Sequence, residues 1–513
     1  MTIELDKKEK VKKSFAPKIV WAIFIFLIIG IIFIGFGFFT SLTKNQKDKY
    51  TNAISILEKK GIKLVNILPQ GEVLGINKKN NEEKYKNYLT MFRGTPKRDW
   101  YGSGNIPEDM EIKWRYPDEP MCGESEDRGE IKKWCGTGWT GQPVVYKNQN
   151  KTEIIFGAYD KKVHFIDPNT GKKVREPFET EDIIKGTVTV DPDGFPLIYF
   201  GSRDNKLRIV SLEEDGQTKE LWQLDAKELP GIWNDDWDAN PVILEDILYT
   251  GGENGWFFAI KLNREMDGTK VSVKPEIIFS LASYDKEFLD KVKDNNVSIE
   301  NSVAIHKDIA YFGNSGGRIL GVKIKENPGE IVFDYWTGDD VDASIVIDDE
   351  GNLYVGVEEE RLNERSKEVG QFLKLNPSKE NPLEWSIAIK SDKENIKGGV
   401  WATPAIHEDY IYVPTNPGDL LVIDKNSGEV KNKYYIGVHA WSSPIISNEK
   451  LLLATCEGKI LVFDIKDGQN ILKINEFAVP GGSCIESTPA LLDGEIFVGS
   501  RDGFFYKIAE KSN

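Results

Sequence analysis

Beyond residue 90, short apolar runs alternate with polar turns, and the same pattern returns every 40 to 62 residues. Each copy begins with an apolar stretch that follows a small residue: GQPVV at 141–145, GTVTV at 186–190, ANPVI at 239–243, NSVAI at 301–305, ASIVI at 343–347, ATPAI at 402–406, SSPII at 442–446 and STPAL at 487–491. Alternating runs of Val, Ile, Tyr and Phe between Gly, Asn and Asp turns are typical of β-strands and hairpins. The pattern therefore predicts eight copies of one β-unit.

Each copy continues in the same order. A second strand ends in a small-residue corner such as IIFGAYD or IFVGSRDG, and a third apolar strand such as KVHFID or FFYKIAE follows. A turn such as PNTGK or KNSGE then leads to a weaker fourth strand. Four antiparallel strands in a unit that repeats about every 40–45 residues, with insertions, predict a β-propeller.

The two ends of the repeat region indicate how the ring closes. The eighth copy ends after its third strand, at Glu510, while an unassigned strand, MEIKWRYP, lies at 110–117. It resembles the fourth strands of the other copies, so we expect it to complete blade eight and leave no open edge. The predicted fold is all-β, an eight-bladed β-propeller of four-stranded antiparallel blades over residues 91–513. Its longest insertion, 262–298, contains a predicted short helix, YDKEFLDKVKD.

A single apolar run precedes the repeats. Residues 19–42 contain no charge, and a helix of that length crosses a bilayer core of about 30 Å. The run exceeds the apolar region of a cleavable signal peptide, the alternative, and it ends in bulky Phe36, Phe38 and Phe39. We therefore expect an uncleaved signal-anchor: one transmembrane helix at 19–42, a tail at 1–18 and a juxtamembrane linker at 43–90.

Charge predicts the orientation of this anchor. The tail carries six lysines against three acids and is expected to stay cytoplasmic. Everything beyond the anchor carries a net charge of −19, with 60 basic and 79 acidic residues. The propeller is then periplasmic or extracellular, and its acidity makes nucleic acid an unfavourable partner.

One set of residues stands out as a candidate binding site. Three residues before the aligned position of each inner strand, the chain carries four carboxylates and two tryptophans, with two more tryptophans adjacent. These positions face one another at the mouth of the channel, and the full set is Trp139, Thr140, Lys185, Trp237, Asp238, Glu300, Asp342, Trp401, Trp441 and Glu486. Carboxylates this close raise one another's pKa unless a cation compensates. The ring is therefore either a site for a cation or cationic group, or a hydrated rim with tryptophans packed between blades.

The segment WCGTGWTGQPVV at 134–145 contains Gly136, Gly138 and Gly141 in the G-x-G-x-x-G spacing of dinucleotide-binding loops. Such a loop needs a strand before it and a helix after it. Here an irregular loop precedes the glycines and a strand follows them. The segment is therefore expected to be the crossover into blade one.

Several repeats resemble a known family. VGSRDGFFYKI at 498–508, FGAYDKKVHFIDPNTGKKV at 156–174 and the lead-in FRGTPKRDWYGSG at 92–104 are similar to pyrroloquinoline-quinone (PQQ)-like propeller repeats. That family includes quinoprotein alcohol dehydrogenases and the propeller lipoprotein of the outer-membrane protein assembly machine. The dehydrogenases hold the quinone over a tryptophan and beneath a ring of two adjacent cysteines, with calcium and an aspartate base. This chain has no adjacent cysteine pair, so we expect no cofactor, PQQ with calcium being the alternative.

All four cysteines lie in the exported part, where an even number favours disulfides. Because strands alternate in direction, the 4→1 crossovers and the 2→3 corners share one face of the propeller. The cysteines all fall on that face, and the expected bridges are Cys122–Cys135 and Cys456–Cys484.

No catalytic constellation is apparent, so the leading functional hypothesis is a non-enzymatic, membrane-anchored scaffold that binds a protein or an envelope component. The alternatives are a quinone- or metal-dependent oxidoreductase that uses the acidic funnel, and a membrane-tethered sensor. No catalytic residue and no metal ligand is assigned. Resemblance of fold decides among these hypotheses only weakly, because one fold carries many activities.

Overall fold

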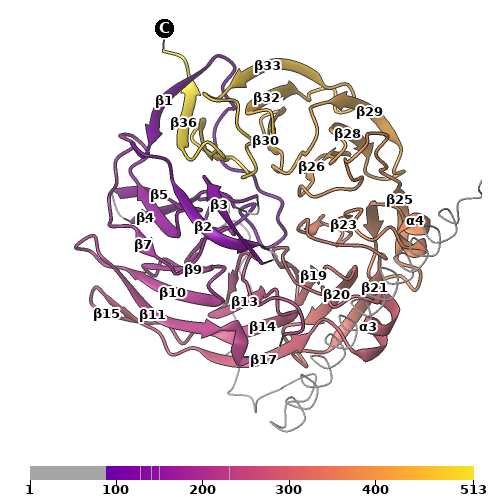
Figure 1. Ribbon diagram of the computed structural model, residues 1–513, viewed down its shortest axis with the longest axis horizontal. Helices are drawn as coiled ribbons and strands as arrows, with labels where there is room; N and C mark the ends of the chain where they lie inside the picture. The colour runs from indigo at the N-terminus through magenta and orange to yellow at the C-terminus, as the bar shows by residue number, and fades with distance from the viewer. Residues whose placement is uncertain (1–87, 128, 140, 149–150, 230, 513) are drawn as a thin grey trace, which may run out of the picture. The chain divides into compact units, whose positions relative to one another are not determined.

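The computed structural model describes residues 88–127, 129–139, 141–148, 151–229 and 231–512. Their main strands form eight four-stranded antiparallel sheets, arranged radially as a ring (Figure 1). The predicted eight-bladed propeller is confirmed. In the part of the chain that the structure describes, no helix is long and apolar enough to cross a membrane. The predicted span at 19–42 and the tail at 1–18 lie outside the described residues.

Each blade runs outward in chain order from the centre of the ring. Blade one consists of β4 (Val144–Asn148), β5 (Lys151–Gly157), β6 (Lys162–Ile166) and β7 (Phe178–Glu179), and blade two of β8 (Thr189–Val190), β9 (Leu197–Gly201), β10 (Lys206–Leu212) and β11 (Thr218–Asp225). Blade three consists of β12 (Val242–Leu244), β13 (Ile247–Gly251), β14 (Trp256–Lys261) and β17 (Glu276–Ala282). Blade four consists of β18 (Ala304–His306), β19 (Ile309–Gly313), β20 (Arg318–Lys323) and β21 (Ile331–Trp336).

The second half of the ring repeats this arrangement. Blade five consists of β22 (Val346–Ile347), β23 (Leu353–Gly356), β24 (Phe372–Leu375) and β25 (Leu383–Ile387). Blade six consists of β26 (Ala405–His407), β27 (Tyr410–Pro414), β28 (Asp419–Asp424) and β29 (Val430–Tyr435). Blade seven consists of β30 (Ile445–Ser447), β31 (Lys450–Ala454), β32 (Lys459–Asp464) and β33 (Leu472–Ala478). Blade eight combines β34 (Ala490–Leu492), β35 (Glu495–Gly499) and β36 (Phe505–Glu510) with β1 (Met110–Tyr116).

The N-terminal strand closes the ring as predicted. β1 pairs antiparallel with β36, from Met110 opposite Glu510 to Tyr116 opposite Phe505. The hydrophobic core lies between neighbouring blades. Phe156 of blade one stacks on Phe505 of blade eight with ring centroids 4.0 Å apart. Closing the ring therefore buries the apolar face that each blade turns toward its neighbour.

A circular hydrogen-bond belt joins the inner strands. Its members directly precede the aligned positions of the repeats: Gln142, Thr187, Asn240, Ser302, Ser344, Thr403, Ser443 and Thr488. In most steps a backbone N–H donates to the side-chain oxygen of the next blade, as from Ser302 to Ser344 at 2.9 Å. The last step runs from the Thr488 N–H to the Gly141 carbonyl at 2.9 Å. Small polar residues at these positions therefore satisfy buried backbone donors from blade to blade.

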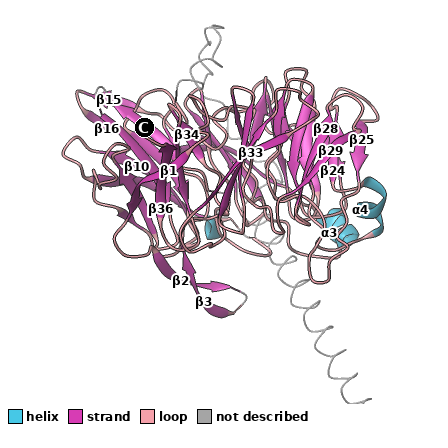
Figure 2. Cartoon of the chain, turned by 90° about the horizontal axis from the view of Figure 1, so that it is seen from above, coloured by secondary structure: helices cyan, strands magenta, loops and turns pink. Residues whose placement is uncertain are grey.

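Several insertions lie between the strands of the repeat. A hairpin of β2 (Cys122–Asp127) and β3 (Glu130–Cys135) precedes blade one and projects beyond the blades in Figure 2, while β15 (Glu265–Asp267) pairs with β16 (Lys270–Ser272) inside blade three. The predicted helix is confirmed as α3 (Lys286–Val292), where the Asp285 side chain caps the N-terminus by accepting from the Phe288 N–H. The sequence did not predict the hairpins, α4 (Glu364–Val369) or the 3₁₀ turn η1 (Ala226–Glu228).

Both predicted disulfides are present. Cys122 and Cys135 face each other across the β2–β3 hairpin, and Cys456 bridges to Cys484. The four cysteines are all bonded. The bridges fix two loops on the face that carries the 4→1 crossovers, which we call the crossover face.

Candidate functional site

The crossover face contains a cavity of about 540 Å³, within the size range of small-molecule sites. Loops from most of the blades line it. The lining residues are Trp134, Trp139, Tyr159, Lys185, Trp233, Asp294, Asn296, Glu300, Asp340, Asp342, Glu358, Glu360, Arg361, Trp401, Trp441 and Glu486. Aromatic rings and carboxylates therefore dominate the surface that a ligand would meet.

Most residues of the predicted ring lie here. Seven of the ten line the cavity: Trp139, Lys185, Glu300, Asp342, Trp401, Trp441 and Glu486. Thr140 lies outside the described residues. That these residues bind a ligand remains a prediction.

Trp237 and Asp238 do not line the cavity. Trp237 is only 1% exposed and fills the space that Gly201 leaves, where an added Cβ would lie 2.1 Å from the Trp237 Cβ. Its indole N–H donates to the Asn205 carbonyl at 2.9 Å. Asp238 is buried against the ammonium group of Lys185. Both residues therefore serve the packing beneath the site.

Two tryptophans from neighbouring blades form one wall. Trp401 and Trp441 stack with ring centroids 5.0 Å apart and planes 15° apart, and we call them the tryptophan pair. Their Nε1 atoms are buried and have no hydrogen-bond partner among the described residues. Two indole donors beside the cavity therefore lack an acceptor among the described residues.

Four carboxylates form a second group, which we call the acidic wall: Glu300, Asp340, Asp342 and Glu358. They come from the crossovers into blades four and five and from the loop between β23 and α4. Burial raises the pKa of each of them above its usual value, and repulsion between neighbouring carboxylates adds to the rise. The pKa of Asp340 is raised to about 8 by burial, although Arg361 opposes the rise. These groups are therefore poised to release protons when a cation binds.

The two cations of the lining, Lys185 and Arg361, are both engaged by carboxylates. Arg361 Nε lies 2.8 Å from Asp294, while its Nη1 is 4.0 Å from Asp340. Among the described residues, Glu300, Asp342 and Glu358 have no ion-pair partner. The other lining acids are compensated, since Glu486 pairs with Arg501 at 3.1 Å and Glu360 with Lys397. The carboxyl groups without a close cation are thus concentrated on the acidic wall.

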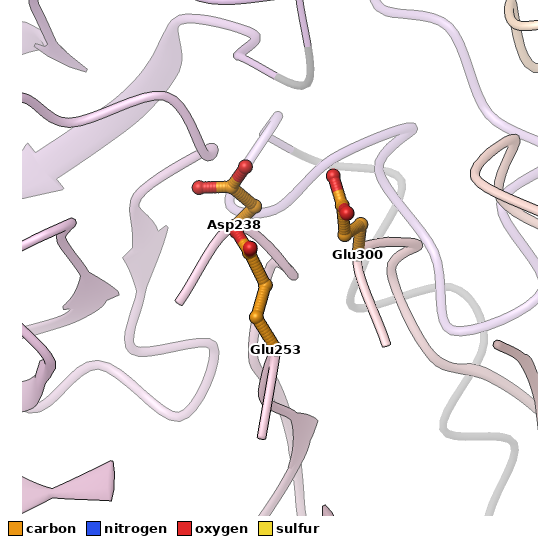
Figure 3. A group of neighbouring side chains, drawn as sticks. All are labelled: Asp238, Glu253 and Glu300. Carbon is orange, nitrogen blue, oxygen red and sulfur yellow. The ribbon is translucent and has the colours of Figure 1, made fainter. Parts of the chain in front are cut away.

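Asp238, Glu253 and Glu300 form a carboxylate cluster (Figure 3), with one oxygen from each within 4.8 Å of the others. Such a group could hold a metal ion. However, the Lys185 ammonium contacts Asp238 and lies 3.9 Å from Glu253. Burial by itself would lower the pKa of Lys185, but Asp238, Glu253 and Glu300 outweigh it and raise the pKa well above the usual value. Lys185 therefore occupies the cation position of this cluster.

The floor of the channel is closed by a segment that the sequence did not identify. Residues 89–104, which we call the plug, hydrogen-bond to every blade, through Val145, Val190, Asn240, Ile305, Ile347, Ile406, Ser447 and Leu491. Its Arg93 is fully buried and donates to the carbonyls of Pro404 and Pro444, each at 2.5 Å. Phe92 of the plug lies beneath Asp342 and the tryptophan pair, and together they line a small gap. The channel is therefore blocked below the site.

The crossover into blade one explains the G-x-G-x-x-G spacing. Gly136 has a φ of +88°, and an added Cβ would lie 1.8 Å from the Ser500 carbonyl oxygen. At Gly138 an added Cβ would lie 2.6 Å from the Lys185 carbonyl oxygen. The strand β3, and not the expected irregular loop, directly precedes the glycines, but the segment continues into β4 rather than into a helix. Its glycines permit close backbone packing beside the cavity and do not form a dinucleotide loop.

The cavity rim is apolar in part. Trp233 lines the cavity and is 48% exposed, and Ile131 in the β2–β3 hairpin is 75% exposed. Trp134 of the same hairpin also reaches the cavity, where the Arg501 guanidinium lies 5.2 Å from its ring. The disulfide-bonded hairpin therefore extends the site outward from the ring.

The sequence did not identify Asp340, Glu358, Glu360, Arg361, Trp134, Tyr159 or Trp233 as lining residues. Tyr159, Glu358, Glu360 and Arg361 lie at 2→3 corners, whereas the predicted ring came from one position in each crossover. The run Glu358, Glu359, Glu360 at one corner was a usable signal, since most other corners carry small residues.

The residues present do not fit pyrroloquinoline quinone well. That cofactor is a tricarboxylate, and its anionic groups would face the carboxyl groups of the acidic wall, where the ion pair of Asp340 with Arg361 spans 4.0 Å. The cations nearest to it, Lys185 and Arg361, are already paired with Asp238 and Asp294. The carboxyl groups and aromatic rings that line the cavity instead favour a cationic ligand.

Comparisons with known proteins agree with the fold. Residues 383–503 match a family model described as outer membrane protein assembly factor BamB. A search of the curated proteins finds no match. Among solved structures, the quinohemoprotein alcohol dehydrogenase from Comamonas testosteroni is 12% identical, with a TM-score of 0.56, over 84% of this chain and 82% of its own.

Two further structures are similar to the same extent. A europium-containing methanol dehydrogenase is 11% identical, with a TM-score of 0.54, over 83% of this chain and 99% of its own. Saccharomyces cerevisiae Sqt1 is 11% identical, with a TM-score of 0.54, over 80% of this chain and 100% of its own. Identities this low establish the fold alone. The resemblance of this chain to the PQQ-like repeat propellers is confirmed, by the sequence of residues 383–503 and by the fold of the ring.

Proposed function

We propose that this protein is a membrane-anchored scaffold that uses the crossover face of its propeller to bind a protein or envelope component outside the cytoplasm. The observation that carries the proposal is the cavity, whose tryptophan pair and acidic wall both have unsatisfied polar groups. Trp233, which lines the cavity and is 48% exposed, adds an apolar group at its rim. The anchor rests on the apolar run at 19–42 and the lysine-rich tail before it.

Site-specific photo-cross-linking in intact cells tests this proposal. A photoreactive amino acid replaces Trp233 at the cavity rim or, as a matched control, Lys307. Lys307 is exposed in the turn between β18 and β19, on the opposite face. The proposal expects a defined adduct from position 233 and none from position 307. Adducts only from position 307, or the same adducts from both positions, would contradict it.

A second measurement addresses the oxidoreductase alternative. The purified full chain is mixed with calcium and pyrroloquinoline quinone, and the cofactor spectrum and dye-linked alcohol oxidation are recorded. The binding proposal expects neither a bound-quinone spectrum nor turnover, because the cations of the lining are already paired and leave none for a tricarboxylate. A stoichiometric spectrum with turnover would favour the oxidoreductase.

A further inference from the structure

We propose that the cavity takes up a basic side chain, lysine or arginine, from a partner polypeptide, with its cation at the acidic wall and its stem along the tryptophan pair. This inference rests on the proposed function and names the chemistry of the group that would be bound. Three features of the site carry it: buried carboxyl groups without a close cation, an aromatic wall and a blind floor.

Asp340 is 5% exposed, its Oδ1 has no hydrogen-bond partner among the described residues, and its ion-pair partner Arg361 is 4.0 Å away. Glu358 is 4% exposed and has no ion-pair partner among these residues. Burying a carboxylate without a partner is costly, so such groups require a proton or a cation. An ammonium or guanidinium group supplies both positive charge and several N–H donors to carboxylate oxygens.

The tryptophan pair favours an organic cation over a metal ion. Indole faces attract ammonium and guanidinium groups and also cover the apolar stem of a lysine or arginine. A metal ion gains nothing from an apolar aromatic wall, whereas the stem of a basic side chain can pack along it. One ligand chemistry thus satisfies both walls.

The shape of the site favours a side chain on a polypeptide over a free polyamine. The plug blocks the channel at Phe92 and Arg93, so a ligand must enter and leave through the crossover face. A chain continuing outward from the cavity would cross the rim, where Trp233 and the β2–β3 hairpin offer exposed apolar surface. A polypeptide can use that surface while its basic side chain is inserted.

Isothermal titration calorimetry of the purified full chain tests the inference. The probes are a blocked glycine pentapeptide with a central lysine, its arginine and acetyl-lysine counterparts, spermidine and calcium chloride. We expect saturable binding of the lysine or arginine peptide and at least about tenfold weaker binding of the acetyl-lysine peptide. Asp342→Asn and Trp441→Phe should each weaken binding about tenfold, while Glu408→Gln in an exposed turn of the opposite face should not change it.

The remaining outcomes separate the two proposals. Tight binding of spermidine or calcium without binding of the peptides would overturn the polypeptide ligand. Equal binding of the lysine and acetyl-lysine peptides would remove the role of charge. If no basic peptide binds but the adduct from position 233 still forms, this inference fails and the proposed function stands. If neither peptide binding nor the adduct from position 233 is observed, both the inference and the proposed function fail. Thermal unfolding of Asp342→Asn and Trp441→Phe confirms that these variants are folded.

Discussion

Trp401 and Trp441 occupy equivalent positions in adjacent blades, and their indole rings stack 5.0 Å apart and within 15° of parallel. The repeat places the two residues at equivalent points of neighbouring crossovers, four residues before β26 and β30, and the ring of blades brings them together. The contact is therefore a direct product of the repeat architecture, and it sets one wall of the proposed binding site.

This stacking predicts a spectroscopic signal. Two indoles in this arrangement are expected to give an exciton-coupled tryptophan band in circular dichroism. Trp401→Phe or Trp441→Phe should abolish the band, whereas Trp233→Phe, at the exposed rim, should leave it unchanged. Persistence of the band in both single variants would show that the pair is not stacked in solution.

Lys185 is predicted to stabilise the propeller by compensating Asp238 and Glu253. Lys185→Met leaves these buried carboxylates without their cation, which should lower the free energy of unfolding by about 3–5 kcal/mol at pH 7. Lys307→Met, at an exposed turn, should change it by less than about 0.5 kcal/mol. Urea denaturation of the full chain measures both. Equal stability of the two variants would contradict the assigned role of Lys185.

The raised pKa of Asp340 predicts a pH dependence of stability. The unfolded state releases this proton near pH 4, but the folded state holds it up to about pH 8. Stability should therefore fall as the pH rises from about 4 to 8. The groups that act on Asp340 are Glu300, Asp342, Glu360 and Arg361.

Asp340→Asn removes this titration. It should raise the thermal midpoint relative to the unchanged chain at pH 8 and have little effect at pH 4. The control is Glu364→Gln, since the exposed Glu364 has a pKa lowered by Lys367 and should show no such gain at pH 8. A gain from Asp340→Asn that is the same at both pH values would argue against a raised pKa.

Arg93 is predicted to be a main stabilising contact of the plug. Arg93→Met leaves the buried carbonyls of Pro404 and Pro444 without donors, at an expected cost of about 3 kcal/mol or more. Arg93→Lys should be intermediate, because an ammonium group cannot reproduce the fork of a guanidinium. Denaturant unfolding of both variants measures their free energies of unfolding and so tests this order of stability. Wild-type stability in Arg93→Met would show that the plug does not depend on this residue.

The sequence predicted the ring because the repeat carries local information. Strand alternation, turn residues and the pairing of β1 with β36 all follow from short stretches of sequence. The same symmetry placed seven candidate residues at the cavity. Trp237 was also predicted to line the cavity, but it packs between blades because Gly201 has no side chain and leaves room for the indole. This packing depends on a contact between two residues that are distant in the sequence.

The plug could not be predicted for a related reason. Residues 89–104 have no strand or helix pattern, and their hydrogen bonds reach all eight blades, up to hundreds of residues away. Arg93 and Arg98 are charged residues that read as exposed in the sequence, yet both are fully buried and donate to backbone carbonyls. Only the assembled ring creates the carbonyl acceptors that make their burial favourable.

The most direct test of the account is hydrogen–deuterium exchange of the full chain, with and without the partner captured at position 233. The account predicts that binding protects the cavity loops at 136–139, 338–342, 357–361 and 437–441. It predicts no change in the opposite turns at 245–246, 307–308, 408–409 and 448–449. Protection confined to those opposite turns would contradict the claim that the crossover face is the binding face.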